Sequence, residues 1–194
     1  MRDLKYEVEF YSIWHCGSGL AGGASKDATV LKDINNLPYI PGKTIKGLVR
    51  EALENILSFS NKEDLYETLI LSLGNSKDHD LRSDVSDDSN AAQKGITFFT
   101  NAVLDEKEQA CIISEQLSEY LYRNISSTAI GENGTAVNHS LRVIECTIPC
   151  KLYGEIQDIP DSIFEEYKMA LQMIKRIGVN RNRGLGRCKF TIKA

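Results

Sequence analysis

The chain has 194 residues, of which 42% are hydrophobic, and it carries a formal net charge of −4 with a pI near 5.5. This length fits a single domain, and the hydrophobic content excludes a chain that is disordered throughout. The sequence has no secretory signal and no run of about 18 apolar residues, so we expect neither export nor a membrane span.

Residues 4–14 are rich in aromatic and β-branched side chains, which predicts the first strand. A glycine-rich loop at 17–23 follows, and an irregular segment extends to Pro41. From residue 43 to residue 57 apolar side chains recur at helical spacing. This part of the chain therefore predicts a strand, a long loop and an amphipathic helix with one buried face.

The middle of the chain alternates between short apolar and long polar stretches. A short helix is expected at 62–73, a long polar loop at 74–95 and a strand at 96–104. Residues 124–140 are polar and contain an Asn-Gly turn signal, which predicts a protruding hairpin. Residues 141–155 predict a long strand that is broken near its proline.

The C-terminal part completes the pattern with a helix at 162–176, a Gly/Arg loop at 180–187 and a strand at 187–193. The core order is strand, helix, two strands, helix and strand, which is the ferredoxin-like βαββαβ order. We therefore expect an α+β fold with this core in one domain, residues 1–194. The core would carry insertions at about 16–41, 74–95 and 123–141.

The five cysteines are odd in number and lack the spacing of a disulfide framework. Cys146 and Cys150 form a lone pair, whereas a structural zinc site needs four ligands. We expect reduced thiols and a cytoplasmic location.

Charge is distributed unevenly along the chain. Residues 175–194 contain seven basic residues and no acid. Lys43, Lys46 and Arg50 form a second basic cluster at the start of the first predicted helix. An acidic protein is unusual as a free-standing nucleic-acid binder, but two local basic patches can bind a polyanion.

The stretch from Arg181 to Arg187 carries the strongest of these signals. Gly184 and Gly186 permit tight backbone turns, and Arg183 lies between the two outer arginines. Such a loop can present N–H groups and guanidinium forks to phosphates. The alternative is a basic connection between helix and strand, and the absence of acids favours the polyanion site.

Two glycine patterns resemble nucleotide-binding loops but lack the required context. Gly17, Gly19 and Gly22 match the dinucleotide spacing, yet no helix is predicted directly after them. Such a loop still allows close backbone approach to phosphates or to another subunit.

The sequence Gly42-Lys43-Thr44 resembles the end of a P-loop, but Leu37 stands where its first glycine would be. An NTPase is therefore not expected. The helix start with Lys43, Lys46 and Arg50 can hold a phosphate or form an ordinary solvated helix face.

Three side chains near the glycine-rich loop could take part in catalysis. His15 could act as a general base, although a lone histidine at a strand end is more often structural. Asp27 and Asp33 lie in a loop, where a carboxylate can bind a divalent metal or accept the proton of a ribose 2′-hydroxyl. A turn-forming role is the commoner one for a single loop aspartate.

Several segments, in this order, resemble the signature of RAMP-superfamily backbone subunits of type III CRISPR effector complexes. The segments are His15–Gly19, Asp27–Asp33, Leu37–Arg50, Gly95–Val103, Thr128–Ala136 with Leu141–Glu145, and Arg181–Arg187.

The resemblance implies a modified, RRM-related ferredoxin-like fold with a thumb-like β-hairpin. The subunit would bind guide RNA, stack head to tail with copies of itself, contact other effector subunits and bind no membrane. Asp27 would cleave complementary target RNA at regular intervals with a divalent ion, Mg or Mn, which it would help to bind. Asp33 matches a second family aspartate. The positions implied to hold RNA are Gly17, Gly19, Lys43, Lys46, Arg50, Arg181, Arg183, Gly184, Gly186 and Arg187.

Three alternatives stay open. The chain could be a structural RAMP subunit without nuclease activity. It could be a stand-alone guide-RNA processing endonuclease that uses His15 as base and no metal. A less favoured alternative is a small-molecule site in the glycine-rich loop.

Overall fold

The computed structural model describes residues 1–193 except 21, 24, 61, 63–64 and 76–93, so most of the expected loop at 74–95 lies outside the described residues. The strands are β1 (Arg2–Phe10), β2 (Phe98–Phe99), β3 (Tyr122–Ser127), β4 (Arg142–Thr147), β5 (Lys151–Ile159) and β6 (Cys188–Lys193). The α-helices are α1 (Gly42–Ser60), α2 (Tyr66–Leu73), α3 (Glu106–Ser114) and α4 (Phe164–Met173). The 3₁₀ turns are η2 (Ser118–Leu121), η3 (Asp161–Ile163) and η4 (Arg181–Arg183).

The main sheet contains four strands in the order β2-β5-β1-β6, and all neighbours are antiparallel. The connection β1–α1–β2 passes over β5, and the connection β5–α4–β6 passes over β1. Each crossover therefore straddles one strand, which is a split βαβ connection. The expected α+β class and the βαββαβ order of the core elements are both observed.

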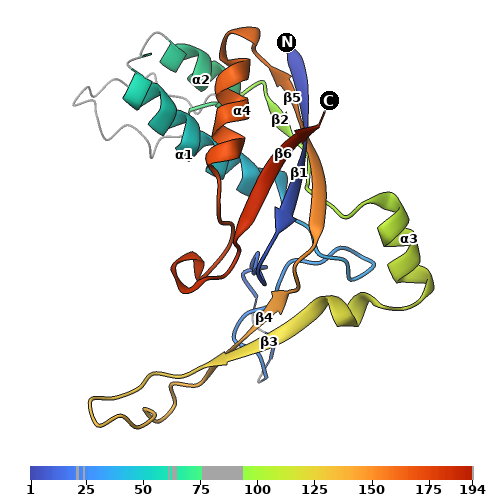
Figure 1. The fold of residues 1–194 in the computed structure, drawn as a ribbon, viewed down its shortest axis with the longest axis vertical. Helices are drawn as coiled ribbons and strands as arrows, with labels where there is room; N and C mark the ends of the chain where they lie inside the picture. The colour runs from blue at the N-terminus through green and yellow to red at the C-terminus, as the bar shows by residue number, and fades with distance from the viewer. Residues whose placement is uncertain (21, 24, 61, 63–64, 76–93, 194) are drawn as a thin grey trace.

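Helices α1 and α4 cover one face of this sheet (Figure 1). Strand β1 alternates accordingly, with Leu4, Tyr6, Val8 and Phe10 buried beneath the helices. The helices contribute the matching apolar stripes, and burial of each such side chain stabilises the fold by about 1.5–3 kcal/mol. The buried helical residues include Ile45, Val49, Leu53, Leu57, Phe164, Tyr167, Ala170 and Leu171.

The other face of the sheet is charged. Glu7 on the central strand is only 7% exposed, and its carboxylate lies 2.7 Å from Lys193 Nζ and 3.7 Å from Lys151 Nζ. The hydrogen bond from Lys193 and both positive charges lower the pKa of Glu7, although partial burial opposes the shift. This face is therefore closed by ion pairs across the strands rather than by a second apolar layer.

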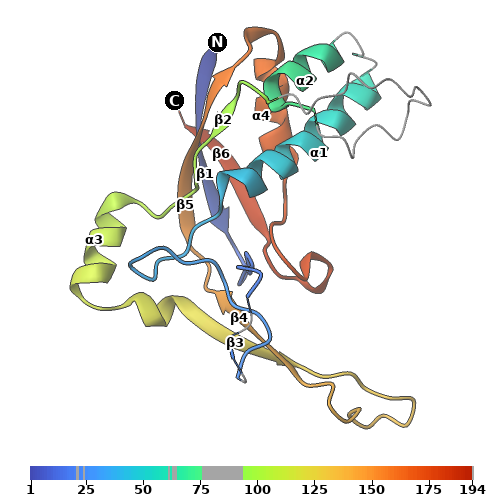
Figure 2. The same cartoon turned by 180° about the vertical axis from the view of Figure 1, so that it is seen from behind.

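The predicted strand 141–155 is in fact two strands in two different sheets. β4 pairs with β3, whereas β5, which begins two residues after Pro149, pairs with β1 and β2. The expected break at the proline is thus a change of sheet. The β3–β4 hairpin has six paired positions, from Tyr122↔Thr147 to Ser127↔Arg142, and projects away from the main body (Figures 1 and 2).

Two predictions fail in detail between residues 96 and 121. Only Phe98–Phe99 of the expected strand 96–104 is a strand, although isolated bridges join Ala102 to Ile40 and Val103 to Tyr153. Helix α3 was not expected because it buries no residue and therefore shows no apolar stripe. Within the described residues, no helix has the length and apolarity needed to cross a bilayer.

Candidate functional site

The chain leaves β1 through residues 11–16, here called the linking segment, which contacts a Gly/Arg loop (residues 176–187) on one side. Tyr11 N donates to Arg187 O at 2.8 Å and Gly186 N donates to Ile13 O at 2.8 Å. Val179 N donates to His15 O at 3.1 Å. These backbone hydrogen bonds, together with one from Arg176 Nη1 to Arg181 O at 2.8 Å, fix the loop, and the side chains of Arg181, Arg183 and Arg187 are exposed.

The same segment holds the base of the β3–β4 hairpin. Trp14 N donates to Thr147 O at 3.0 Å, and Thr147 N donates to Trp14 O at 2.7 Å. The indole N–H of Trp14 donates to Ile148 O at 3.1 Å, and its ring stacks on Phe10 with centroids 4.5 Å apart. Trp14 is 1% exposed, so this junction anchors the hairpin in the apolar core.

The glycine-rich turn after the linking segment folds back on itself. Leu31 N donates to Cys16 O at 2.9 Å, and Ser18 N donates to Thr29 O at 3.0 Å. Gly17 pairs with Val30 in an isolated bridge. The turn therefore returns the chain toward the hairpin.

The returning segment places Asp27 beside β4. Asp27 N donates to Val143 O at 2.8 Å, and Val143 N donates to Asp27 Oδ2 at 2.6 Å. Glu145 N donates to Ala28 O at 3.0 Å. Asp27 is exposed, and no other donor in the described part of the chain forms a hydrogen bond with its carboxylate. The second oxygen can therefore accept a ligand or a proton from outside.

Asp33 has a different role. Its Oδ1 accepts hydrogen bonds from Asn35 N and Leu37 N, both at 2.8 Å, so the carboxylate closes an Asx-type turn. Asp33 thus accepts two N–H groups of its own turn, whereas Asp27 accepts one N–H from β4 and has a second oxygen that accepts no hydrogen bond from the described residues.

Glu145 is the residue of this site that the sequence analysis missed. Its side chain is 4% exposed and lies 2.6 Å from Lys26 Nζ and 3.2 Å from Lys32 Nζ. It also accepts from Val30 N at 3.3 Å. One carboxylate on β4 therefore binds three donors of the Asp27 loop. The sequence feature that could have pointed to Glu145 is its position as the one charged residue in the mostly apolar run VIECTI, residues 143–148.

These partners also determine the protonation of Glu145. Burial raises its pKa, but the hydrogen bonds from Lys26 and Lys32, the charge of Lys32 and the Val30 N–H outweigh burial, and the pKa lies below its ordinary value. A small polar pocket of about 330 Å³ opens here, lined by Lys26, Lys32, Glu119, Tyr122, Asn124 and Glu145.

His15 is buried and structural. It is 2% exposed, and its Nδ1 lies 2.5 Å from Glu145 O, which requires the Nδ1–H tautomer because a carbonyl only accepts. A Cβ on Gly17 would lie 3.0 Å from the other ring nitrogen. The imidazole is enclosed and cannot reach an RNA strand in this conformation.

The basic residues of α1 do not share one role. Lys43 is exposed, and Lys46 is half-buried with a pKa lowered by burial and by the charge of Arg50. Arg50 instead donates to Leu73 O at 2.9 Å and Gly74 O at 2.7 Å and so caps the end of α2. Of the three predicted phosphate ligands on this helix, Arg50 therefore has a structural role, since its guanidinium is hydrogen-bonded to the end of α2.

The Gly/Arg loop carries its arginines outward. Arg181, Arg183 and Arg187 are exposed, and no acid among the described residues forms an ion pair with any of them. Gly184 and Gly186 have φ values of 89° and 68°, in the left-handed region. A Cβ at Gly186 would collide with the carbonyl of Ile177, whereas a Cβ at Gly184 would meet nothing within 4 Å.

The predicted residues therefore come together around the linking segment. The Gly/Arg loop contacts one side of it, and the turn containing Gly17 and Gly19 follows it. The helix start beside Lys43 is close as well, since burial raises the pKa of the Cys16 thiol while the Thr44 side chain and the charge of Lys43 both oppose that rise. Arg50 is directed away, toward α2.

The donor set around Asp27 fits a metal ion only if RNA supplies further ligands. Among the described residues, no group of three or more His, Cys, Asp or Glu side chains could hold an ion. Mg²⁺ commonly binds through one or two carboxylates together with substrate phosphates and water. The single exposed carboxylate of Asp27 matches that arrangement and does not match a cage formed by protein alone.

Glu145→Gln is expected to lower the free energy of unfolding at pH 7 by about 1–3 kcal/mol, because two lysines lose their partly buried carboxylate. The folded-state pKa of Glu145 lies below the value of about 4.3 for an unfolded chain. Its charge therefore stabilises the fold above that pH, and the contribution is lost as pH falls through the folded-state pKa. Urea unfolding should show that the difference in the free energy of unfolding between the wild type and Glu145→Gln is smaller at about pH 3 than at pH 7. Glu132→Gln, at an exposed position, is the control, and an equal gap at both pH values would contradict the role of the charge.

Gly186→Ala is expected to destabilise the protein more than Gly184→Ala. Both changes place a side chain at positive φ, at about 1–2 kcal/mol each, but only the first also forces a collision with a backbone carbonyl. Melting temperatures of the two variants measure the difference, and equal values would mean that the loop backbone is not held as described.

We compared the chain with known protein families, curated proteins and solved structures. A family model described as the RAMP superfamily matches residues 7–189. A search of curated proteins gives no match.

Solved structures with the same fold include a chain of type III-B Cmr-beta bound to cognate target RNA, with a TM-score of 0.69 and 9% identity, which covers 99% of this chain and 97% of that chain. A chain of type III-B Cmr-beta in the apo state has a TM-score of 0.70 and 10% identity and covers 98% and 96%. At these identities the likeness concerns the fold. The family match spans most of the sequence, and the chain belongs to the RAMP superfamily.

Proposed function

We propose that the chain is an RNA-binding subunit of a type III CRISPR effector complex and that it cleaves target RNA through Asp27. Two observations carry the proposal. An exposed arginine loop contacts the linking segment, and the projecting hairpin that the same segment anchors holds the exposed carboxylate of Asp27. The likeness in fold to chains of type III-B Cmr-beta, one of them bound to cognate target RNA, supports it. Guide RNA, target RNA and other effector subunits are the partners.

Phosphates of the guide RNA bind the basic surface. Lys43, Lys46, Arg181, Arg183 and Arg187 provide charge. Contacts to the backbone supply affinity without reading sequence, which suits a subunit that must accept any guide. Arg50 is left out of this set because its guanidinium caps α2.

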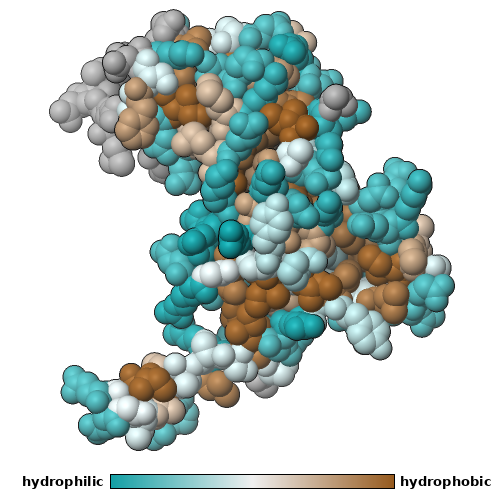
Figure 3. Space-filling view, in the orientation of Figure 1, coloured by the Kyte–Doolittle hydropathy of each residue, from teal (hydrophilic) through white to brown (hydrophobic). Residues whose placement is uncertain are grey.

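The hairpin is suited to separate bases of the guide–target duplex. Near its tip Ile130 is 62% and Val137 is 48% exposed, and Leu141, just before β4, is 64% exposed. The surface view shows hydrophobic colour at this tip, at the far end of the projecting arm (Figure 3). Apolar side chains that are held away from the body in this way can insert between base steps. Asp27 lies beside Val143, which pairs with Ser126 toward the outer end of the β3–β4 ladder.

Cleavage needs a group that activates the ribose 2′-hydroxyl. Asp27 accepts that proton as the 2′-oxygen attacks the adjacent phosphorus, and the 5′-oxygen leaves with a proton from water. Glu145, Lys26 and Lys32 hold the loop so that the carboxylate keeps one orientation. A divalent ion held by Asp27 and RNA phosphate would neutralise charge on the phosphate.

The second candidate is a structural subunit of the same complex without nuclease activity. One observation favours it: Asp27 already accepts a backbone hydrogen bond, as a turn-forming aspartate would. A stand-alone processing enzyme that uses His15 is disfavoured because the imidazole is buried.

Asp27→Asn in the assembled complex is expected to reduce target cleavage by at least about 100-fold, because the amide cannot take a proton. The amide oxygen can still accept from Val143 N, so RNA binding should persist. Asp33→Asn is the matched control, since its turn needs only an acceptor, and it should cut like the wild type. Undiminished cutting by Asp27→Asn would remove this residue from the mechanism, and an inactive wild-type complex would support the structural subunit.

Lys46→Ala combined with Arg183→Ala is expected to weaken RNA retention as salt is raised. The slope of log K against log salt is negative, and each lost phosphate contact makes it less steep by about 0.7–0.9. Filter binding across a salt titration measures it, with Lys5→Ala combined with Lys94→Ala as a control of equal charge change at other exposed sites. Identical slopes in both double variants would refute the assigned RNA surface.

A further inference from the structure

Helix α3 makes little apolar contact within its own chain, where Ile112 is only partly buried against the core. None of its nine residues is buried, and it lies at the side of the molecule beyond β5 (Figures 1 and 2). Ile113 is 44% exposed and Leu117, just after the helix, is 41% exposed. An isolated helix of this length is marginal in water and gains most of its stability from packing of an apolar face.

The α3 segment is also strongly acidic. Residues 105–119 contain five acids, Asp105, Glu106, Glu108, Glu115 and Glu119, and one base, Lys107. Neither Glu106 nor Glu108 forms an ion pair with any described residue of the chain. The segment therefore presents apolar side chains flanked by uncompensated negative charge.

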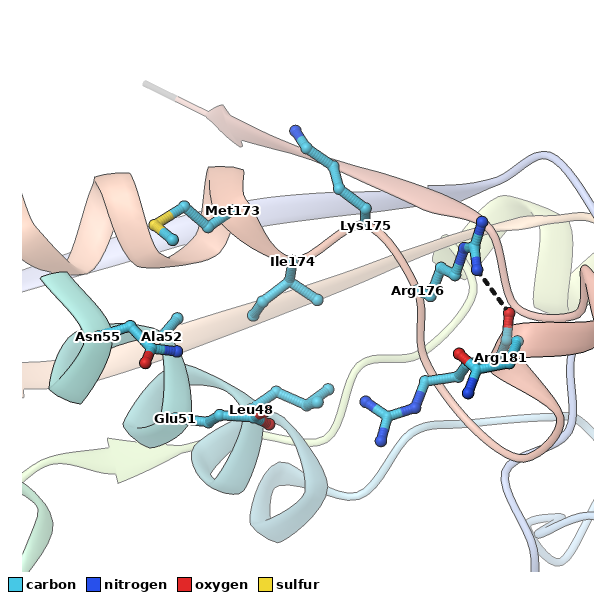
Figure 4. A pocket seen from close by; sticks show the side chains of 10 residues that line it. Leu48, Glu51, Ala52, Asn55, Met173, Ile174, Lys175, Arg176 and Arg181 are labelled. Carbon is cyan, nitrogen blue, oxygen red and sulfur yellow. Dashed lines mark hydrogen bonds between the residues drawn. The ribbon is translucent and has the colours of Figure 1, made fainter.

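A pocket of complementary character lies between α1 and the end of α4. Its volume is about 330 Å³. Leu48, Ala52 and Ile174 form an apolar floor, and Met173 beside them is 49% exposed. Figure 4 shows the basic side chains of the rim around this floor. The basic rim residues are Lys175, Arg176 and Arg181, and Glu51 is the acid of the lining.

We infer that α3 of one copy of this chain docks into the α1–α4 pocket of the next copy. The apolar residues of α3 match the apolar floor, and its acids match Lys175 and Arg176 of the rim, which leaves Arg181 to the proposed RNA surface. The one base of the segment, Lys107, has a counterpart in Glu51. RNA phosphate would use the rim and leave the apolar floor unpaired, so a protein segment fits this pocket better than RNA does.

The positions of the two surfaces determine the kind of assembly. In both ribbon views α3 and the Gly/Arg loop beside the pocket lie on opposite sides of the molecule (Figures 1 and 2). Two different surfaces on opposite sides form a heterologous contact, which repeats from copy to copy instead of closing as a dimer. The inference rests on the proposed role as a repeating subunit and assigns its contact surfaces.

Charge reversal of each surface tests the contact in the full-length chain. Glu106→Lys with Glu108→Lys reverses α3, and Lys175→Glu with Arg176→Glu reverses the rim; neither pair includes a residue proposed to bind RNA. In light scattering at low salt, the wild type is expected to form assemblies with and without RNA that dissociate as salt is raised. Each double variant alone should be monomeric, and an equimolar mixture of the two should assemble again because the reversed charges complement each other.

The control is Glu67→Lys with Glu132→Lys, which has the same charge change as the α3 variant at two exposed sites elsewhere and should assemble like the wild type. A monomeric wild type, assembly that survives both reversals, or a mixture that fails to assemble would each overturn the docking. Loss of RNA with unchanged assembly in the rim variant would show that RNA occupies the pocket and would overturn it as well. RNA retention, measured on the same samples from absorbance at 260 and 280 nm, reports on the proposed function separately.

Discussion

The linking segment, residues 11–16, is the constraint on which the site depends. It is partly buried, so its backbone N–H and C=O groups need hydrogen-bond partners. The hairpin supplies them on one side through Thr147, and the Gly/Arg loop supplies them on the other through Gly186 and Val179. One short stretch after β1 therefore joins the hairpin and the Gly/Arg loop, two segments that are far apart in the sequence.

Glu145 adds a second, electrostatic constraint. A nearly buried carboxylate is costly unless it is paired and hydrogen-bonded, and here two lysines and one backbone N–H satisfy it. All three donors belong to the loop that carries Asp27. The buried charge thus orders a loop that has few apolar residues of its own, and it leaves the Asp27 carboxylate at the surface.

The sequence by itself determined the class of the fold and most of its elements. Helical spacing at 43–57 corresponds to α1, and the apolar periodicity at 162–176 corresponds to η3 and α4. Both signals are local, because a helix repeats its buried face every three to four residues. The polar stretch before Leu141 correctly predicted a hairpin, and the arginines and glycines of 181–187 predicted an exposed basic loop.

Tertiary structure alone decided which of these residues meet. Pro149 marks a change of sheet, Arg50 caps α2, and Glu145 pairs with lysines more than 100 residues earlier in the chain. No local pattern encodes such contacts, because each depends on a partner that only the folded chain brings near. The sequence did not predict helix α3 for the same reason. The helix has no fully buried residue and so shows no apolar periodicity, and its local signals were the N-cap Asp105 and two acids in the first turn. Sequence determined which elements form, and long-range packing determined what their side chains can do.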